Sequence, residues 1–253
     1  MNKEEFEKLI SPSFSNKRCE LKKEVVEIYH SHFPNHSKTT SSLRVYYFLN
    51  EYNIAYSYDI NHFRTSNGLI PFKNNFNYTE ICDLFNKVNK KIPICVWSSS
   101  IYSKFMSMQT LDEFIYVEVP KYSIEFVKYF LASKGVFELS SSSYADLIYK
   151  GIKIVLKTYN EYNPIEMKVC TTGNYPDYYE AKIEKIIVDL YANKFDFISD
   201  GDKYIIIKQI FSKYQVNITT LLSYARSRNK KELFLYLLNK LGFADEKGQI
   251  IYD

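Results

Sequence analysis

ICVWSSSIYSKFMSMQTLDEFIYVEV, residues 94–119, is the stretch that decides the predicted fold. It begins with the apolar run 94–97 and ends with the β-branched and aromatic run 114–119. Runs of this length and composition are typical of buried strands. Three serines between them form a good helix N-cap. Apolar residues then recur at helical spacing: Ile101, Phe105 and Met108. The stretch therefore predicts a strand, a helix and a strand in one βαβ-like unit.

The composition of the rest of the chain is that of a folded globular protein. Of 253 residues, 46% are hydrophobic and 25% are charged, which is ordinary for this class. The 24 Tyr and 18 Phe indicate a core built largely from aromatic rings. The formal net charge of +4 is mildly basic, so it permits nucleic-acid binding without requiring it.

The cysteines and the hydropathy pattern bear on the compartment. Cys19, Cys82, Cys95 and Cys170 form no CxxC pair, which predicts reduced thiols. The first residues are charged and include no signal-peptide segment, and no apolar run approaches the ~20 residues of a membrane helix. We therefore expect a cytoplasmic protein that does not enter a membrane.

Residues 1–74 show the pattern of a winged helix-turn-helix. Residues 19–32 place apolar side chains on one helical face, and a Phe-Pro-Asn sequence stops that helix. A cluster of small polar residues, 38–42, then leads into the apolar run 43–49, as a cap leads into a second helix. Asn67-Gly68 is a hairpin signal for a following wing. A plain helical pair remains the alternative.

The predicted DNA-contacting residues are polar and basic. Hydroxyl groups and cations at a helix N-terminus contact phosphates, and Arg in a wing reaches a minor groove or a phosphate. In the winged module these residues are Lys38, Thr39, Thr40, Ser42, Arg44, Tyr47 and Arg64. A second basic segment lies near the C-terminus, at Arg226, Arg228, Lys230 and Lys231. Two interpretations of this segment stay open, a solvated helix end and a nucleic-acid contact.

The remaining sequence predicts an α+β fold. Residues 75–175 alternate between strands and helices, as a mixed α/β domain does, and residues 176–253 form a helical C-terminal part packed on it. Strands are expected at 136–139, 152–159 and 167–171. Helices are expected at 76–91, 122–134, 144–149, 180–191, 204–214 and 232–241.

Motifs of enzyme chemistry are absent from the sequence. It has no GxGxxG, Walker-type loop, GxSxG or HExxH motif. His30, His32 and His36 lack a Cys or carboxylate at close spacing, so they indicate solvated imidazoles at a helix end and no metal site. Glu118 and Lys121 resemble a nuclease carboxylate and lysine, although Pro120 interrupts them. We expect neither catalysis nor a cofactor, and we keep a nuclease-like defence protein as an alternative.

Four segments carry a resemblance to a known family. They are residues 93–119, residues 182–191, residues 214–225 and the Arg44-Val45-Tyr46 sequence. In this order they resemble the AbiEi-like antitoxins of type IV toxin–antitoxin systems, which act in abortive infection. The resemblance covers most of the chain, and its motifs are structural patterns with no catalytic residue among them.

The resemblance implies an antitoxin of antiviral defence. Its N-terminal winged helix binds operator DNA and represses transcription of its operon, and its C-terminal domain counteracts a nucleotidyltransferase toxin. The alternative is a transcriptional regulator without a toxin partner. The chain departs from the family in its wing, because Arg64 is the only Lys or Arg in residues 53–70. This departure shifts the expected phosphate contacts toward residues 226–231.

Overall fold

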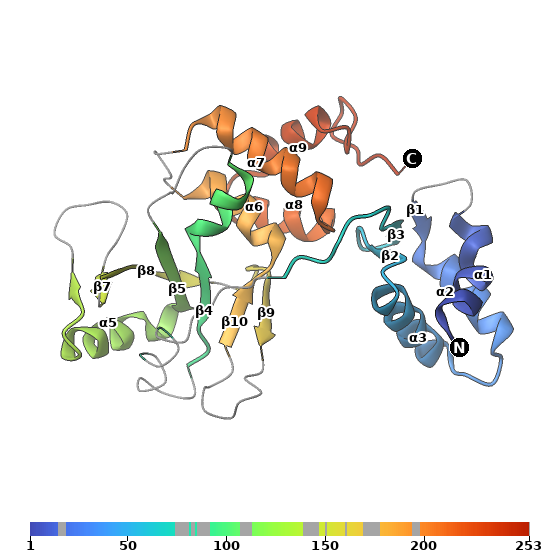
Figure 1. Cartoon of the computed structure of the whole chain (residues 1–253), viewed down its shortest axis with the longest axis horizontal. Helices are drawn as coiled ribbons and strands as arrows, with labels where there is room; N and C mark the ends of the chain where they lie inside the picture. Colours follow the sequence, from blue (N-terminus) through green and yellow to red (C-terminus); the bar gives the residue numbers. More distant parts are fainter. Residues whose placement is uncertain are drawn as a thin grey trace. The chain divides into compact units, whose positions relative to one another are not determined.

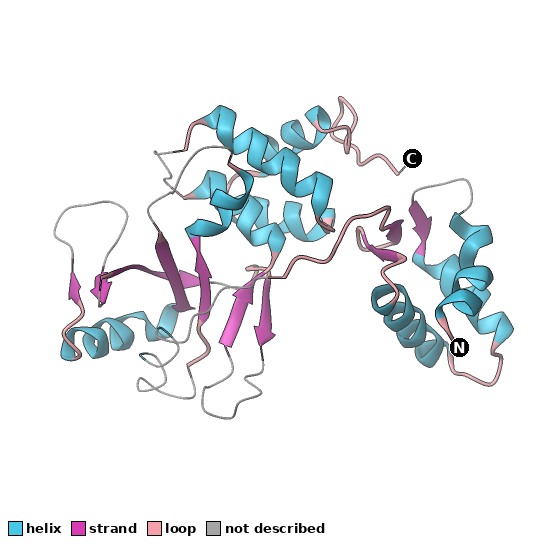
Figure 2. Ribbon diagram, viewed as in Figure 1, coloured by secondary structure: helices cyan, strands magenta, loops and turns pink. Residues whose placement is uncertain are grey.

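The computed structural model divides the chain into two compact units. Unit 1 comprises Met1–Phe72 and Ile210–Asp253, and unit 2 comprises Lys73–Gln209. The structure describes residues 1–14, 19–73, 81, 84, 92–106, 113–138, 147–149, 151–159, 161–168, 178–193 and 198–252. Both units combine helices with a β-sheet, so the expected α+β class is confirmed (Figures 1 and 2).

The N-terminal part of unit 1 packs three helices with a small antiparallel sheet. Its elements in chain order are α1 (Lys3–Phe14), β1 (Cys19–Leu21), α2 (Lys22–His32), α3 (Lys38–Glu51), β2 (Ala55–Ser57) and β3 (His62–Thr65). The strand order is β1-β3-β2. Phe6, Val25, Val45 and Phe63 are fully buried where the helices meet the sheet. The apolar faces of three helices thus share one core.

The hairpin β2–β3 turns at a different place from the expected one. Asp59 closes its turn, accepting hydrogen bonds at 2.7 Å from the backbone N–H groups of Asn61 and His62. An Asx turn of this kind satisfies the backbone of a tight connection. Asn67 and Gly68, which the sequence assigned to the hairpin, have positive φ in the turn after β3.

The C-terminal part of unit 1 contains α8 (Ile218–Ser227) and α9 (Lys231–Lys240) and is joined to this hairpin. Ile70 forms a parallel β-bridge with Tyr214, and the Ile218 N–H donates to the Tyr58 carbonyl at 2.8 Å. The sequence assigned all of residues 176–253 to a part packed on the α/β domain. Residues 210–253 instead cluster with the N-terminal part, because backbone hydrogen bonds tie them to it.

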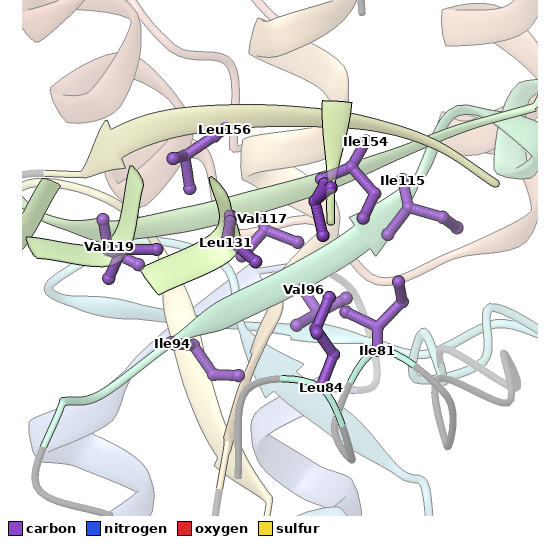
Figure 3. Packing of buried hydrophobic residues seen from close by; sticks show 12 residues of the cluster. Ile81, Leu84, Ile94, Val96, Ile115, Val117, Val119, Leu131, Ile154 and Leu156 are labelled. Carbon is purple, nitrogen blue, oxygen red and sulfur yellow. The ribbon is translucent and has the colours of Figure 1, made fainter. Parts of the chain in front are cut away.

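Unit 2 is built on a seven-stranded sheet with the order β6-β7-β8-β5-β4-β10-β9. Its strands are β4 (Cys95–Ser98), β5 (Phe114–Pro120), β6 (Phe137–Glu138), β7 (Leu147–Tyr149), β8 (Ile152–Tyr159), β9 (Ile165–Lys168) and β10 (Tyr178–Ala181). Val96 and Val117 from neighbouring strands contact a cluster that also includes Leu131 of α5 (Ile124–Ser133). Figure 3 shows these side chains gathered between strands and helix.

Residues 94–119 contain the two expected strands, but these strands do not form a βαβ unit. β4 and β5 pair antiparallel, with Val96 opposite Val117, whereas a βαβ unit requires parallel strands. A short 3-10 helix, η1 (Ser99–Phe105), follows β4, and the Phe114 N–H closes the connection by donating to the Ser99 hydroxyl at 2.9 Å. The parallel neighbours are β8 beside β5 and β10 beside β4.

Most of the expected helices and strands occur in the described residues. The strand at 152–159 and the helices at 122–134, 180–191, 204–214 and 232–241 are confirmed with small shifts of their ends, as α6 (Ile183–Ala192) and α7 (Asp200–Lys213) show. The helix at 144–149 is wrong, because β7 pairs with β8 there and Gly151 takes a φ of +83° that suits a tight turn. Most of the expected helix 76–91, like Met108, lies outside the described residues.

Candidate nucleic-acid interface

Helix α3 is the element on which most of the predicted DNA-contacting residues lie. It begins at Lys38, earlier than expected, because Ser37 caps it by accepting a hydrogen bond from the Thr40 N–H at 3.1 Å. The polar cluster 38–42 is therefore the first turn of the helix and not a turn before it. Ser41, fully buried, bonds to His30 of α2 at 3.1 Å and so fixes α3 against its neighbour.

The opposite face of α3 is exposed. Leu43 and Tyr47, four residues apart, have exposed fractions of 68% and 56%. Thr39 and Arg44 are exposed beside them, as is Lys38 at the helix start. Thr40 and Ser42 are half-buried, and the Thr40 hydroxyl bonds to Ser37. The face therefore presents two cations, hydroxyl groups and an apolar centre on a helix whose other side is locked in the core.

Arg64 does not occupy the exposed wing position that the sequence assigned to it. Its guanidinium carbon lies 4.8 Å from the ring centroids of both Tyr58 and Phe243. A guanidinium between two aromatic rings is held by cation–π attraction. Phe243 belongs to the C-terminal part of unit 1, so the half-buried Arg64 packs within the unit, and these contacts favour a packing role over the predicted nucleic-acid contact.

The tip of the hairpin is engaged in the same way. The Ile60 N–H donates to the Thr219 hydroxyl at 3.3 Å. The His62 ring stacks on the Tyr252 ring with 4.1 Å between the ring centroids. Burial alone raises the pKa of Asp59, but hydrogen bonds from Tyr252, Asn61 and His62 outweigh it and hold this pKa below its ordinary value. The hairpin that would form the wing is thus a docking platform for the C-terminal segment.

The basic segment forms the turn between α8 and α9. Arg228 caps the end of α8, Asn229 has a φ of +55°, and Lys230 precedes α9. Arg226 is exposed, whereas Arg228, Lys230 and Lys231 are half-buried. Cations at the end of α8 are favoured by its dipole, which supports the interpretation as a helix end.

The predicted site residues thus fall into three places of unit 1. The α3 residues form one continuous face, Arg64 lies in the docked hairpin, and the basic segment lies in the α8–α9 turn. The contacts described above tie the C-terminal part to the hairpin and the residues after it through 214–219, 243 and 252. The sequence reasoning missed Leu43, which a helix beginning at Lys38 places opposite the buried Ser41, Val45 and Phe48.

Glu118, the carboxylate of the nuclease alternative, lies inside unit 2. Its side chain accepts hydrogen bonds from the Trp97 indole at 2.8 Å, from Lys185 at 2.7 Å and from Asn163 at 3.0 Å. Lys185, from α6, also pairs with Asp189, and these three charged side chains are almost fully buried. The Lys185 ammonium is shared by both carboxylates, and hydrogen bonds from Trp97 and Asn163 further stabilise the buried Glu118 carboxylate. Lys121, the expected partner of Glu118, is exposed.

The remaining candidates for chemistry within the described residues give no further site, and Cys82 and Cys170 lie outside those residues. Burial raises the pKa of the Cys95 thiol well above its ordinary value, and the Glu118 carboxylate adds to the rise, so this thiol is unreactive. His36 stacks on Phe33. Within the described part of the chain, no group of His, Cys, Asp and Glu residues has the arrangement of a metal site. No described helix is long and apolar enough to span a bilayer.

The chain matches a protein-family model. A family model described as "Family of unknown function (DUF6577)" matches residues 40–242. This span runs from the first turn of α3 to the residues just after α9, so it includes parts of both units. No curated protein matches the chain.

Proposed function

We propose that this chain, which belongs to the family of unknown function DUF6577, is a DNA-binding antitoxin that represses its own operon and counteracts a nucleotidyltransferase toxin. The exposed face of α3 carries the DNA-binding half of the proposal. A helix fixed on its inner side and exposed with cations and hydroxyl groups on its outer side suits insertion into a major groove.

The order of elements in residues 1–72 supports a winged-helix class for this module. Helix, strand, two helices and two strands follow one another, and the last strand lies between the other two. Residues 33–37 form the short turn between α2 and α3. In the proposed complex α3 is the recognition helix, and the hairpin has an internal role.

The distribution of charge supports the same surface. Unit 1 contains 16 Lys and Arg against 12 Asp and Glu, whereas unit 2 contains 17 of each. The formal excess of positive charge therefore resides in unit 1. Phosphate neutralisation supplies much of the affinity of DNA-binding proteins, so the unit with the excess is the better candidate.

Each residue of the α3 face has a chemical role in this proposal. Lys38 and Thr39, at the positive end of the helix dipole, contact phosphates. Arg44 donates to a guanine edge or a phosphate, and Leu43 contacts a thymine methyl group. Tyr47, one turn further, extends the contact along the groove.

The antitoxin half rests on the resemblance of residues 93–119, 182–191 and 214–225 to AbiEi-like antitoxins. Most of these residues lie in unit 2, whose balanced charge fits a protein partner better than a polyanion. The buried cluster around Glu118 does not favour the nuclease alternative, because its carboxylate is already paired with Lys185.

A two-part experiment tests this proposal. The neighbouring gene, which this proposal expects to encode a nucleotidyltransferase, is expressed with and without the chain, and a reporter is placed behind the upstream DNA of the gene. We expect the chain to restore growth and to repress the reporter. Repression without restored growth would indicate a regulator without a toxin partner. If the chain neither restores growth nor represses the reporter, the proposal is refuted.

A further inference from the structure

Unit 2 has an exposed row of aromatic side chains along helix α5 and the turn before it. Tyr122, Phe126 and Tyr129 have exposed fractions of 81%, 50% and 79%. Phe126 and Tyr129, three residues apart, lie on one face of α5, and Tyr122 lies in the 3-10 helix η2 (Lys121–Ser123) that leads into it. We call these three residues the α5 aromatic row.

The inner face of the same helix is fixed in the core. Val127 and Leu131 are fully buried against Val117 and Val119 of β5 and their neighbours. The rings of the α5 aromatic row are therefore presented from a rigid support, so little backbone order remains to be lost when they are covered.

The size of the row indicates an interaction site. A large aromatic side chain buries ~150–250 Å² when fully covered, so three such side chains with the exposed fractions given above offer about 400 Å². Singly exposed apolar residues are normal, whereas a row of this size equals the largest apolar patch of a typical monomer, which is often functional. It is about half of the ~800 Å² that a stable interface needs from each partner, which suits the apolar centre of a larger interface.

The charges beside the row indicate which partner fits. Lys121, Lys128 and Lys134 are exposed along the same segment, and Glu125 is the acidic residue there, 3.5 Å from Lys128. A second copy of this chain would bring like charges together across a two-fold interface. A partner with an apolar groove edged by carboxylates meets both the rings and the lysines.

We propose that the α5 aromatic row is the surface by which unit 2 binds the nucleotidyltransferase, at an apolar groove edged by acidic residues. This inference rests on the proposed function and adds the binding surface to it. A single-stranded nucleic acid also stacks on aromatic rings near cations. The proposal is the protein partner, and stacking of an oligonucleotide on the row is one outcome of the test.

The test measures binding of the purified full-length chain to the purified neighbouring nucleotidyltransferase by calorimetry. In the test variant, Tyr122→Ser, Phe126→Ser and Tyr129→Ser are combined. The matched control is Tyr162→Ser, another exposed tyrosine of unit 2. We expect the triple variant to bind at least ~30-fold more weakly and the control to bind as the wild type does. A second variant, Lys121→Glu with Lys128→Glu, weakens binding while keeping the rings.

The outcomes separate this inference from the proposed function. If the wild type binds the toxin and both variants bind equally well, the surface is wrong and the function stands. If the wild type neither binds the toxin nor restores growth, both fail. If the triple variant loses binding only to a single-stranded oligonucleotide, the partner is wrong. Trp97 fluorescence and thermal unfolding verify that every variant is folded.

Discussion

At the scale of single residues, Arg44 and Arg64 in the N-terminal part of unit 1 have opposite surroundings. Arg44 is exposed on α3, whereas Arg64 lies between the rings of Tyr58 and Phe243. An exposed guanidinium is available to a phosphate, and a stacked one contributes to packing. We therefore expect replacement of Arg44 to weaken DNA binding and replacement of Arg64 to lower stability.

Replacement of Arg64 tests the packing role. We expect Arg64→Ala to lower the free energy of unfolding of unit 1 by about 1–2 kcal/mol, because two cation–π contacts and their packing are lost. Operator affinity stays within about twofold, since no phosphate contact is removed. Urea unfolding and a binding titration measure the two quantities. Lys247→Ala, at an exposed site of unit 1, is the control. A loss of DNA affinity in Arg64→Ala without loss of stability would contradict the assignment.

Lys185 is expected to be a residue on which unit 2 depends. Lys185→Met leaves the buried carboxylates of Glu118 and Asp189 without their cation, which costs about 3–5 kcal/mol. Lys128→Met is the matched control, because its ion pair with Glu125 is exposed and contributes less than about 1 kcal/mol. Denaturant unfolding followed by Trp97 fluorescence gives both values, and equal effects would disprove the structural role of the cluster.

At the scale of elements, the β2–β3 hairpin links the two chain segments of unit 1. Its turn is closed by Asp59, and its edges bond to residues near α8 and the C-terminus. The acidity of Asp59 makes this link dependent on pH, since hydrogen bonds from Tyr252, Asn61 and His62 favour the ionised carboxyl.

The pH dependence has a definite sign. Because the pKa of Asp59 in the folded chain lies below its ordinary value of 3.8, the carboxylate stabilises the fold above that value. This stabilisation is lost as the pH falls through the lowered pKa. We expect Asp59→Asn to remove that part of the acid sensitivity of unit 1, and Glu232→Gln to keep it. Chemical unfolding at a series of pH values from neutral down to about pH 3 measures the free energy of unfolding of each variant. If this free energy falls with pH in parallel for wild type and Asp59→Asn, the role of Asp59 is contradicted.

Local sequence patterns predicted the helices and strands far better than they predicted which strands pair in the sheet. The helix with Val127 and Leu131 on its inner face was predictable, because apolar spacing reports burial of a helix. The antiparallel pairing of β4 with β5 was not, since it depends on β8 and β10, which lie later in the chain.

The candidate site shows the same limit. The sequence indicated the α3 residues, because a cap and a basic residue lie close together there. It misplaced Arg64, because the ring of Phe243 that covers it lies near the other end of the chain. No local signal reports such a contact.

At the scale of the whole molecule, the chain is two units with separate cores. Trp97, the only tryptophan, is fully buried in unit 2, where it stacks on Tyr116 at 4.1 Å and donates to Glu118. Its fluorescence therefore reports on unit 2, whereas circular dichroism reports on both units.

Two unfolding transitions are expected on this ground. Trp97 fluorescence should follow one transition, which Lys185→Met shifts, and circular dichroism should show a second, which Arg64→Ala shifts. Coincident transitions in the wild type and in both variants would indicate one cooperative unit instead.

The central claim is that α3 binds the DNA upstream of the gene. The direct measurement is the fluorescence anisotropy of labelled upstream DNA and of a scrambled control, titrated over a range of salt with wild type and Arg44→Ala. We predict specific, salt-sensitive binding that Arg44→Ala weakens about tenfold, with a salt slope smaller by about 1. Equal binding to both DNAs, or an unchanged affinity of Arg44→Ala, would contradict the claim.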